Sequence, residues 1–322
     1  MTICVAALST HSNGGLAVVG AADRMKTAGS TEFETELSKA WLFSSSIIAL
    51  CSGDNDLQNA LLVPVGDIVT ARINEAPKVW WKVEDVANLY REEYFKVRSK
   101  RAERTYLEPL GLRMDTLIAR QKDMDRFLVD DLTNKLWNFE MPATETIFMG
   151  VDPTGTRLFM WVNEELHNRG VSSFASIGAG FKHADSEMMS AGHTWRRSLE
   201  DTIVLVHSAK KRAEAAPGVG KSTDMYVIGP NLGSVDHINS WDDGKAFAEL
   251  ERQYKRRVRQ EKSAAEKTAK PFKDYMATRT KATLPQDKKI DLAPGTFAIK
   301  GGEAEVSVSA SSEPEPAPGA VP

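Results

Sequence analysis

Two short apolar runs separated by a glycine-containing turn open the chain. Residues 3–8 and 16–22 are almost wholly apolar, and the HSNGG segment at residues 11–15 has typical turn composition. This pattern predicts a β-hairpin, and residues 40–43 and 47–51 repeat it. Because the runs are apolar at consecutive positions, we expect both faces of the sheets they form to be covered.

The rest of the pattern contains further strands and several helices. Strands in consecutive hairpins, without regular strand–helix–strand alternation, indicate an α+β fold with antiparallel sheets. We therefore predict an αββα sandwich, in which two stacked antiparallel sheets are flanked by helices. The further strands are predicted at residues 146–150, 157–162, 174–177 and 223–228, and the helices at residues 57–69, 84–103, 112–137, 181–191 and 196–215.

Three regions follow from these elements and from composition. Residues 1–230 are predicted to form the sandwich domain, and residues 76–140 within it form an enlarged, charged helical insertion. Residues 231–289 are predicted to be a charged helical extension. Residues 290–322 have few large apolar side chains and many prolines, which predicts a disordered tail.

Composition excludes several classes of protein. Hydrophobic residues make up 42% and charged residues 26% of the 322 residues, which is the balance of a globular protein. A net charge of −3 argues against a general nucleic-acid binder, and no apolar run is long enough to span a membrane. With only two cysteines and no basic N-terminal region, we expect a cytosolic protein without disulfides. The basic excess in residues 245–289 favours a solvated helix face, with an acidic partner or nucleic acid as the alternative.

One segment is similar to a phosphate-binding P-loop. Residues 215–223 read AAPGVGKST, where Ala215 replaces the first glycine of that motif. A P-loop follows a strand and begins a helix, whereas here a predicted helix precedes the segment and a strand follows it. We therefore favour a simple helix-to-strand turn and keep nucleotide binding as the lesser alternative.

The histidines and cysteines do not predict a metal or cofactor. None of the six histidines forms a close pair with metal-ligand spacing. Cys4 and Cys51 lie in predicted apolar strands without an obvious neighbouring base, which favours inert buried thiols.

Thr2 is the strongest candidate for chemistry. A small residue after Met1 permits removal of the initiator methionine, which would place the Thr2 hydroxyl beside its own α-amine. The unperturbed pKa of an α-amine is about 7.7–8.0, so the neutral amine can act as a general base for the hydroxyl. Such a nucleophile also needs a nearby cation and an oxyanion donor.

The order of motifs around Thr2 resembles the proteasome-type β-subunit branch of the N-terminal nucleophile (Ntn) hydrolases. Thr2 begins the first strand and AADR (residues 21–24) closes the second. Lys39 enters the third, Ser-Gly at 52–53 closes the fourth, and the separations of 16 residues from Asp23 to Lys39 and 14 from Lys39 to Gly53 fit the family. Further likenesses lie in the hairpin at residues 150–155, the turn at residues 177–180 and the strand at residues 223–228.

The resemblance implies an αββα Ntn fold and a threonine-type peptidase or amidase. It implies Thr2 as nucleophile, Lys39 as the cation, Asp23 as the partner that orients Lys39, and the Gly53 amide as oxyanion donor. The pocket for the substrate residue before the scissile bond would be lined by Trp41, Cys51 and Asn55. Ala179 and Gly180 would belong to the supporting turn.

The chain departs from the family at the outer support of the N-terminus. Ala179 replaces a serine of the family, and the family's acid and second serine before the last strand fall at Ala216 and Val219. Other residues, such as Ser176 or Ser222, would have to supply this support.

Three functions stay open from the sequence. The first is the threonine hydrolase, acting on a peptide or amide within a homo-oligomeric ring, with an unfoldase partner left open. The second is a non-catalytic ring subunit of the same fold. The third is a nucleotide-binding protein that uses Lys221.

Overall fold

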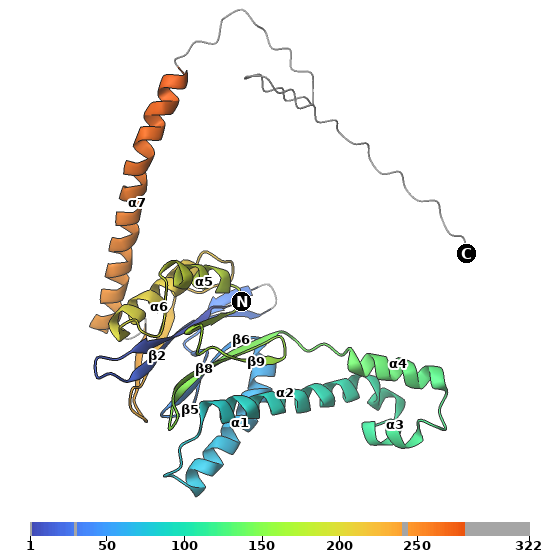
Figure 1. Cartoon of the computed structure of the whole chain (residues 1–322). Helices are drawn as coiled ribbons and strands as arrows, with labels where there is room; N and C mark the ends of the chain where they lie inside the picture. The colour runs from blue at the N-terminus through green and yellow to red at the C-terminus, as the bar shows by residue number, and fades with distance from the viewer. Residues whose placement is uncertain (1, 29–30, 240–243, 281–322) are drawn as a thin grey trace, which may run out of the picture. The chain divides into compact units, whose positions relative to one another are not determined.

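A computed structural model describes residues 2–28, 31–239 and 244–280 of the chain. Two five-stranded antiparallel sheets form its centre (Figure 1). The first sheet has the order β10-β1-β2-β11-β12, comprising Phe174–Ile177, Cys4–Thr10, Leu16–Asp23, Thr223–Ile228 and Val235–Asn239. The second has the order β5-β6-β7-β8-β9, comprising Ala40–Ser44, Ile47–Gly53, Thr144–Asp152, Gly155–Val162 and Glu165–Asn168.

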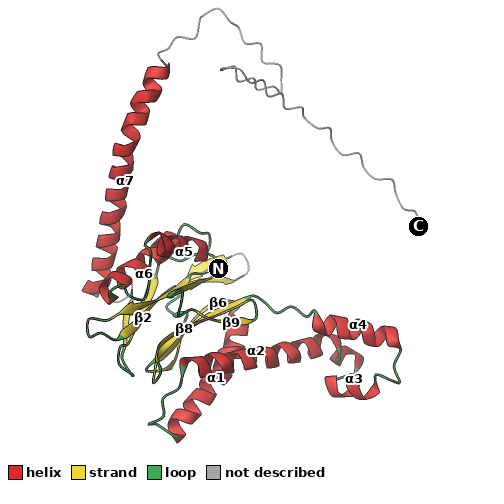
Figure 2. Ribbon diagram, viewed as in Figure 1, coloured by secondary structure: helices red, strands yellow, loops and turns green. Residues whose placement is uncertain are grey.

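Helices cover the outer face of each sheet and complete four layers (Figure 2). Helices α5 (Phe181–Ser190) and α6 (Leu199–Ala213) pack on the first sheet. Helices α1 (Asn55–Glu75) and α2 (Val83–Tyr106) pack on the second. The predicted αββα sandwich is therefore confirmed.

Alternation of side chains explains the fully apolar strands. In β1, Val5 and Ala7 belong to the cluster beneath α5 and α6, whereas Cys4 and Ala6 belong to the cluster between the sheets. The second sheet repeats this arrangement, since Ala49 faces the helices and Leu50 faces the other sheet. Each strand thus contributes to two cores, because successive side chains point to opposite faces.

The helical insertion extends beyond the second sheet along α2. The first half of α2 packs on the sheet. Its second half joins the 3₁₀ turn η1 (Glu108–Leu110), α3 (Met114–Arg120) and α4 (Arg126–Trp137) around a small separate apolar cluster. The prediction of one helix over residues 112–137 was wrong, because the Asp125 side chain accepts a hydrogen bond from the Leu128 amide at 3.1 Å and starts a second helix.

Short strands complete the description. The hairpin of β3 (Met25–Ala28) and β4 (Thr31–Glu34), together with β9 and β12, had no counterpart in the predicted elements. The chain divides into two compact units, Met1–Gln260 and Glu261–Pro322. Helix α7 (Lys245–Thr280) begins in the first unit, where Leu250 joins the cluster beneath α5 and α6. The tail predicted at residues 290–322 lies outside the described residues.

None of the helices in the described ranges is both long and apolar enough to cross a lipid bilayer.

Candidate active site

Strand register brings the residues around Thr2 together. Strands β1 and β2 are antiparallel with Cys4 opposite Ala22, so the start of β1 meets the end of β2, where Asp23 lies. Lys39 directly precedes β5, and its carbonyl accepts a hydrogen bond from the Cys51 amide at 3.0 Å, close to the end of β6. Four strand ends thus meet at one place.

Thr2, Asp23 and Lys39 form a contiguous buried trio. The Thr2 hydroxyl donates to Asp23 Oδ1 and accepts from the Lys39 ammonium, and Lys39 Nζ lies 2.8 Å from Asp23 Oδ1. Asp23 is fully buried, and 9% of the Lys39 side chain is exposed. A carboxylate and an ammonium in direct contact offset the cost of burying each other, and both lie beside a single hydroxyl.

Backbone amides complete the environment of Asp23. Its Oδ1 accepts from the Ile3 amide at 3.1 Å, and its Oδ2 accepts from Gly220 at 2.7 Å and Met25 at 3.3 Å. One neighbouring amide and two from segments distant in sequence therefore fix the orientation of this carboxylate, and through it the position of Lys39.

A pocket of about 340 Å³ opens beside Thr2. Its lining includes side chains of both charge signs. Cys51, Gly53 and Asn55, to which the resemblance assigns substrate contact and oxyanion binding, are among the lining residues. Its lining residues are Thr2, Met25, Lys26, Lys39, Cys51, Ser52, Gly53, Asp54, Asn55 and Asp56.

Trp41 is not among the described residues that line this pocket. Its ring belongs to the apolar cluster of the second sheet and faces α1, where a Cβ added to Gly66 would lie 3.3 Å from the indole nitrogen. The structure therefore places Trp41 beneath the helix, apart from the open space next to Thr2.

Gly53 occupies a backbone position that only glycine suits. Its φ is +104°, and an added Cβ would lie 2.2 Å from the Ala143 carbonyl oxygen. The strand end that forms this wall of the pocket is thus fixed by the requirement for glycine.

The turn at residues 178–180 supports the main chain of Thr2. The Gly180 amide donates to the Thr2 carbonyl at 3.3 Å, and a Cβ on Gly178 would lie 2.4 Å from the same oxygen. Ala179 is exposed and offers only a methyl group. The Gly178 amide donates to Glu145 Oε2 at 2.7 Å, a contact that sequence reasoning missed.

The two serines considered as substitutes for the missing support bond elsewhere. Ser176 Oγ donates to the Asp185 carboxylate and to the Phe181 carbonyl, at the start of α5. Ser222 Oγ donates to the Glu34 carboxylate on β4. Neither hydroxyl is hydrogen-bonded to Thr2.

The segment similar to a P-loop joins α6 to β11, the order expected of a turn. Ala216 and Val219 are buried in the cluster beneath α5 and α6. The Gly220 amide binds Asp23, while the Lys221 and Ser222 amides bind Glu34. The amides that would cradle a phosphate thus bind two of the protein's own carboxylates, which speaks against nucleotide binding.

Lys210 holds this turn in place through hydrogen bonds to its backbone. The sequence did not predict this role. Lys210 is fully buried in α6, and its ammonium donates to Glu214 Oε1 at 2.6 Å, to the Gly220 carbonyl at 2.9 Å and to the Lys221 carbonyl at 3.0 Å. Lys210 is one of three basic residues in the last turn of α6, where basic side chains are usually exposed to solvent. The sequence therefore did not indicate that Lys210 is buried.

The thiols lack the properties of nucleophiles. Burial raises the pKa of Cys4 well above its ordinary value, and burial likewise raises the pKa of Cys51 to about 12. Both groups are therefore neutral near pH 7. Within the described ranges, no three acidic, histidine or cysteine side chains are grouped so as to hold a metal ion.

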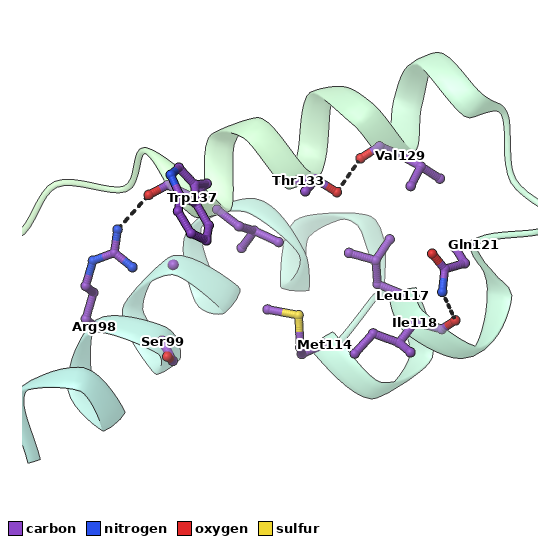
Figure 3. A pocket seen from close by; sticks show the side chains of 11 residues that line it. Arg98, Ser99, Met114, Leu117, Ile118, Gln121, Val129, Thr133 and Trp137 are labelled. Carbon is purple, nitrogen blue, oxygen red and sulfur yellow. Dashed lines mark hydrogen bonds between the residues drawn. The ribbon is translucent and has the colours of Figure 1, made fainter. Parts of the chain in front are cut away.

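A second pocket, of about 330 Å³, lies within the helical insertion. Figure 3 shows its side chains projecting from α2, α3 and α4, with Arg98 bonded to the Trp137 carbonyl at 2.8 Å. Its lining is mainly apolar, and Arg98 is its one charged residue. Its lining among the described residues contains no acid–base pair suited to hydrolysis, whereas the pocket beside Thr2 adjoins the Thr2–Asp23–Lys39 trio and is taken as the candidate active site.

Comparison with known proteins gives one line of evidence. No protein-family model and no curated protein sequence matches the chain. Among solved structures, the chain is similar to a Gly-1 mutant of Anbu from Hyphomicrobium sp. strain MC1, with a TM-score of 0.53 and 16% identity over 82% of this chain and 97% of the other. At this identity the likeness shows the fold alone, a proteasome-like αββα sandwich.

Proposed function

We propose that the protein is a threonine-type peptidase or amidase whose nucleophile is Thr2, exposed by removal of Met1. The observation that carries this proposal is the contact of one hydroxyl, Thr2 Oγ1, with both Lys39 Nζ and Asp23 Oδ1 at the edge of a pocket. No histidine is among the described residues that line the pocket, so the base in the proposed reaction is the α-amine of Thr2 itself.

The proposed reaction has two balanced stages. Thr2 Oγ attacks the carbonyl carbon, its proton moves to the α-amine, and the carbonyl π electrons move to oxygen, where the Gly53 amide stabilises the charge. Collapse of this intermediate breaks the C–N bond, and the leaving amine takes the proton from the α-ammonium. Water then hydrolyses the Thr2 ester by the same sequence of proton transfers, which releases the acid and restores the hydroxyl. The reaction needs no cofactor.

Lys39 and Asp23 have distinct roles in this scheme. The Lys39 ammonium lowers the pKa of the neighbouring α-amine by like-charge repulsion and stabilises the developing alkoxide. Asp23, held by three backbone amides, keeps Lys39 charged and oriented. The trio therefore acts as a unit, and loss of either charge is expected to abolish turnover.

The substrate is a peptide or amide without a strong charge preference. Lys26 and Lys39 lie in the same pocket wall as Asp54 and Asp56, so the wall favours neither sign of charge. We further propose that the chain assembles into a closed homo-oligomeric ring, which would bury edges and shelter the sites.

A non-catalytic ring subunit of the same fold is the second candidate. The observation in its favour is that Ala179, Ala216 and Val219 replace all three polar side chains that the family places around the N-terminus. These two functions make opposite predictions for Thr2.

The test is hydrolysis of a fluorogenic peptide-amide panel by protein whose intact mass lacks Met1. Thr2→Ala is expected to abolish hydrolysis without loss of fold, and Thr2→Ser to retain part of it because hydroxyl and amine both survive. Thr133→Ala, at an exposed threonine on α4, is the matched control. Full hydrolysis by Thr2→Ala, or retention of Met1 in an active protein, would refute the proposal.

A further inference from the structure

Glu145 is an acidic side chain at the edge of the space between the two sheets. It lies near the start of β7, where Ile147, Met149 and Val151 face the other sheet. Because side chains alternate along a strand, Glu145 continues that inward face at the end nearest the candidate site. Ser52 lies directly opposite it on β6, adjacent to Gly53.

The contacts of Glu145 place its carboxylate close to the main chain of Thr2. Its Oε2 accepts from the Gly178 amide at 2.7 Å, and Gly178 packs against the Thr2 carbonyl so tightly that a Cβ would lie 2.4 Å from it. Within the described part of the chain, Oε1 has no hydrogen-bond partner. One carboxylate oxygen is thus held by Gly178, which itself contacts Thr2. The other oxygen is available to a further hydrogen-bond donor.

Glu145 lies close enough to the Cys4 thiol to influence it together with Asp23 and Lys39. Cys4 lies two residues after Thr2, and burial raises the pKa of its thiol. The charge of Lys39 lowers this pKa, and the charges of Asp23 and Glu145 raise it. These side chains therefore share one poorly hydrated region.

A free, protonated N-terminus of Thr2 would gain from a negative partner that is not already saturated by other contacts. Asp23 already binds Lys39, the Thr2 hydroxyl and three amides. Ala179 offers no hydrogen bond, and the Ala216 and Val219 side chains lie in a core cluster. Beside the Lys39 ammonium, an α-ammonium is disfavoured by like-charge repulsion unless a further carboxylate lies close to it.

We propose that Glu145 is a positioning residue that pairs with the α-ammonium of Thr2 and replaces the polar support missing at Ala179, Ala216 and Val219. The inference rests on the proposed function. The carboxylate holds the amine in line with the hydroxyl and raises the amine pKa, while Lys39 lowers it. The balance of the two charges keeps the amine titrating near neutral pH.

Glu145→Gln separates charge from hydrogen bonding. The amide oxygen of glutamine still accepts from Gly178, but the charge is gone, so the amine pKa falls. In the processed protein, the acid limb of the pH–rate profile is expected to move to lower pH by about half a unit or more. Glu165→Gln, at an exposed glutamate on β9 of the same sheet, is the matched control and leaves the limb in place.

A second readout does not depend on turnover. Reductive methylation with ¹³C-formaldehyde labels the N-terminal amine, whose NMR titration lies well below that of the lysines. Glu145→Gln is expected to lower this pKa, whereas Glu145→Asp, which retains the charge, keeps it closer to that of the unmutated protein. If Glu145→Gln does not fold, Glu145→Ala removes the charge without burying an amide and serves in its place.

The outcomes are distinct. An unchanged amine titration in the charge-removing variant would overturn the role of Glu145, even if hydrolysis by Thr2 is observed. Absence of hydrolysis in the unmutated protein, together with an amine pKa that depends on Glu145, would refute the proposed function and leave the pairing intact.

Discussion

The buried ammonium of Lys210 should be important for both stability and the site. Lys210 is fully buried, and its Nζ donates to Glu214 Oε1 and to the carbonyls of Gly220 and Lys221. Through this turn it fixes the Gly220 amide that binds Asp23. Lys210→Met preserves the length of the side chain but removes all three donated bonds.

The magnitude follows from the groups left behind. Removing one partner of a buried ion pair costs about 3–5 kcal/mol. Glu214 keeps a contact with Lys211 at 2.9 Å, so we expect the lower end of that range, about 3 kcal/mol. Burial lowers the pKa of Lys210 despite Glu214, which indicates that the charged pair itself gives little net stabilisation. The double variant Lys210→Met/Glu214→Met should therefore recover part of the loss.

Urea unfolding followed by circular dichroism measures this effect. The matched control is Lys211→Met, where a neighbouring lysine in the same helix pairs with Glu214 and Glu251 at a more exposed position. We expect the control to lose about 1 kcal/mol or less. A loss for Lys210→Met below about 1 kcal/mol, or equal to that of the control, would refute the reasoning.

Three further predictions concern the pocket wall, acid stability and assembly. Gly53→Ala should lower the free energy of unfolding by roughly 1–3 kcal/mol in urea titrations, because its Cβ would meet the Ala143 carbonyl at positive φ; an unchanged midpoint would contradict this. Burial lowers the pKa of His207 to about 4. The facing Glu251 raises this pKa in part, whereas the charges of Lys211 and Lys210 lower it further. Since an unfolded histidine titrates near 6.5, stability is full above that pH and falls by up to about 3 kcal/mol as pH drops to 4. His207→Gln should flatten this part of the pH dependence in thermal unfolding, and an unaltered slope would exclude His207 as its source. In multi-angle light scattering the processed protein should elute as a discrete ring, and a monodisperse monomer at micromolar concentration would contradict the assembly proposal.

The sequence predicts the sandwich well because the buried strands appear as short runs of consecutive apolar residues. Residues 3–8 are apolar at every position, and the structure distributes them between two cores. The break between α3 and α4 was harder to anticipate, because apolar residues recur on both sides of the turn at residues 121–125, where Asp125 caps the second helix. The strands β9 and β12 are short and polar at their exposed positions, which weakens the period-2 signal.

In the candidate site, too, some residues could be predicted from the sequence and others could not. Thr2, Asp23, Lys39 and Gly53 lie at strand ends whose order and spacing carry a resemblance, and antiparallel register brings them together. The roles of Glu145 and Lys210 arise from contacts across the fold. No local pattern marks a glutamate at the start of a strand as the partner of a turn 33 residues later.

Trp41 shows where the resemblance and the structure differ. The resemblance implies that Trp41 lines the substrate pocket, but the face of β5 that carries it is covered by α1. Which part of that face stays open depends on where the helix begins and how closely Gly66 lets it approach, and both are tertiary properties.

The most direct test of the account is covalent labelling of Thr2. A peptide epoxyketone reacts with a hydroxyl and an adjacent free amine, so it should modify only a processed N-terminal threonine. After incubation and digestion, mass spectrometry should find the adduct on the N-terminal peptide lacking Met1, and Thr2→Ala and Lys39→Ala should carry none. An unmodified Thr2 in protein that has lost Met1, or equal labelling of Thr2→Ala, would contradict the assignment of Thr2 as the nucleophile.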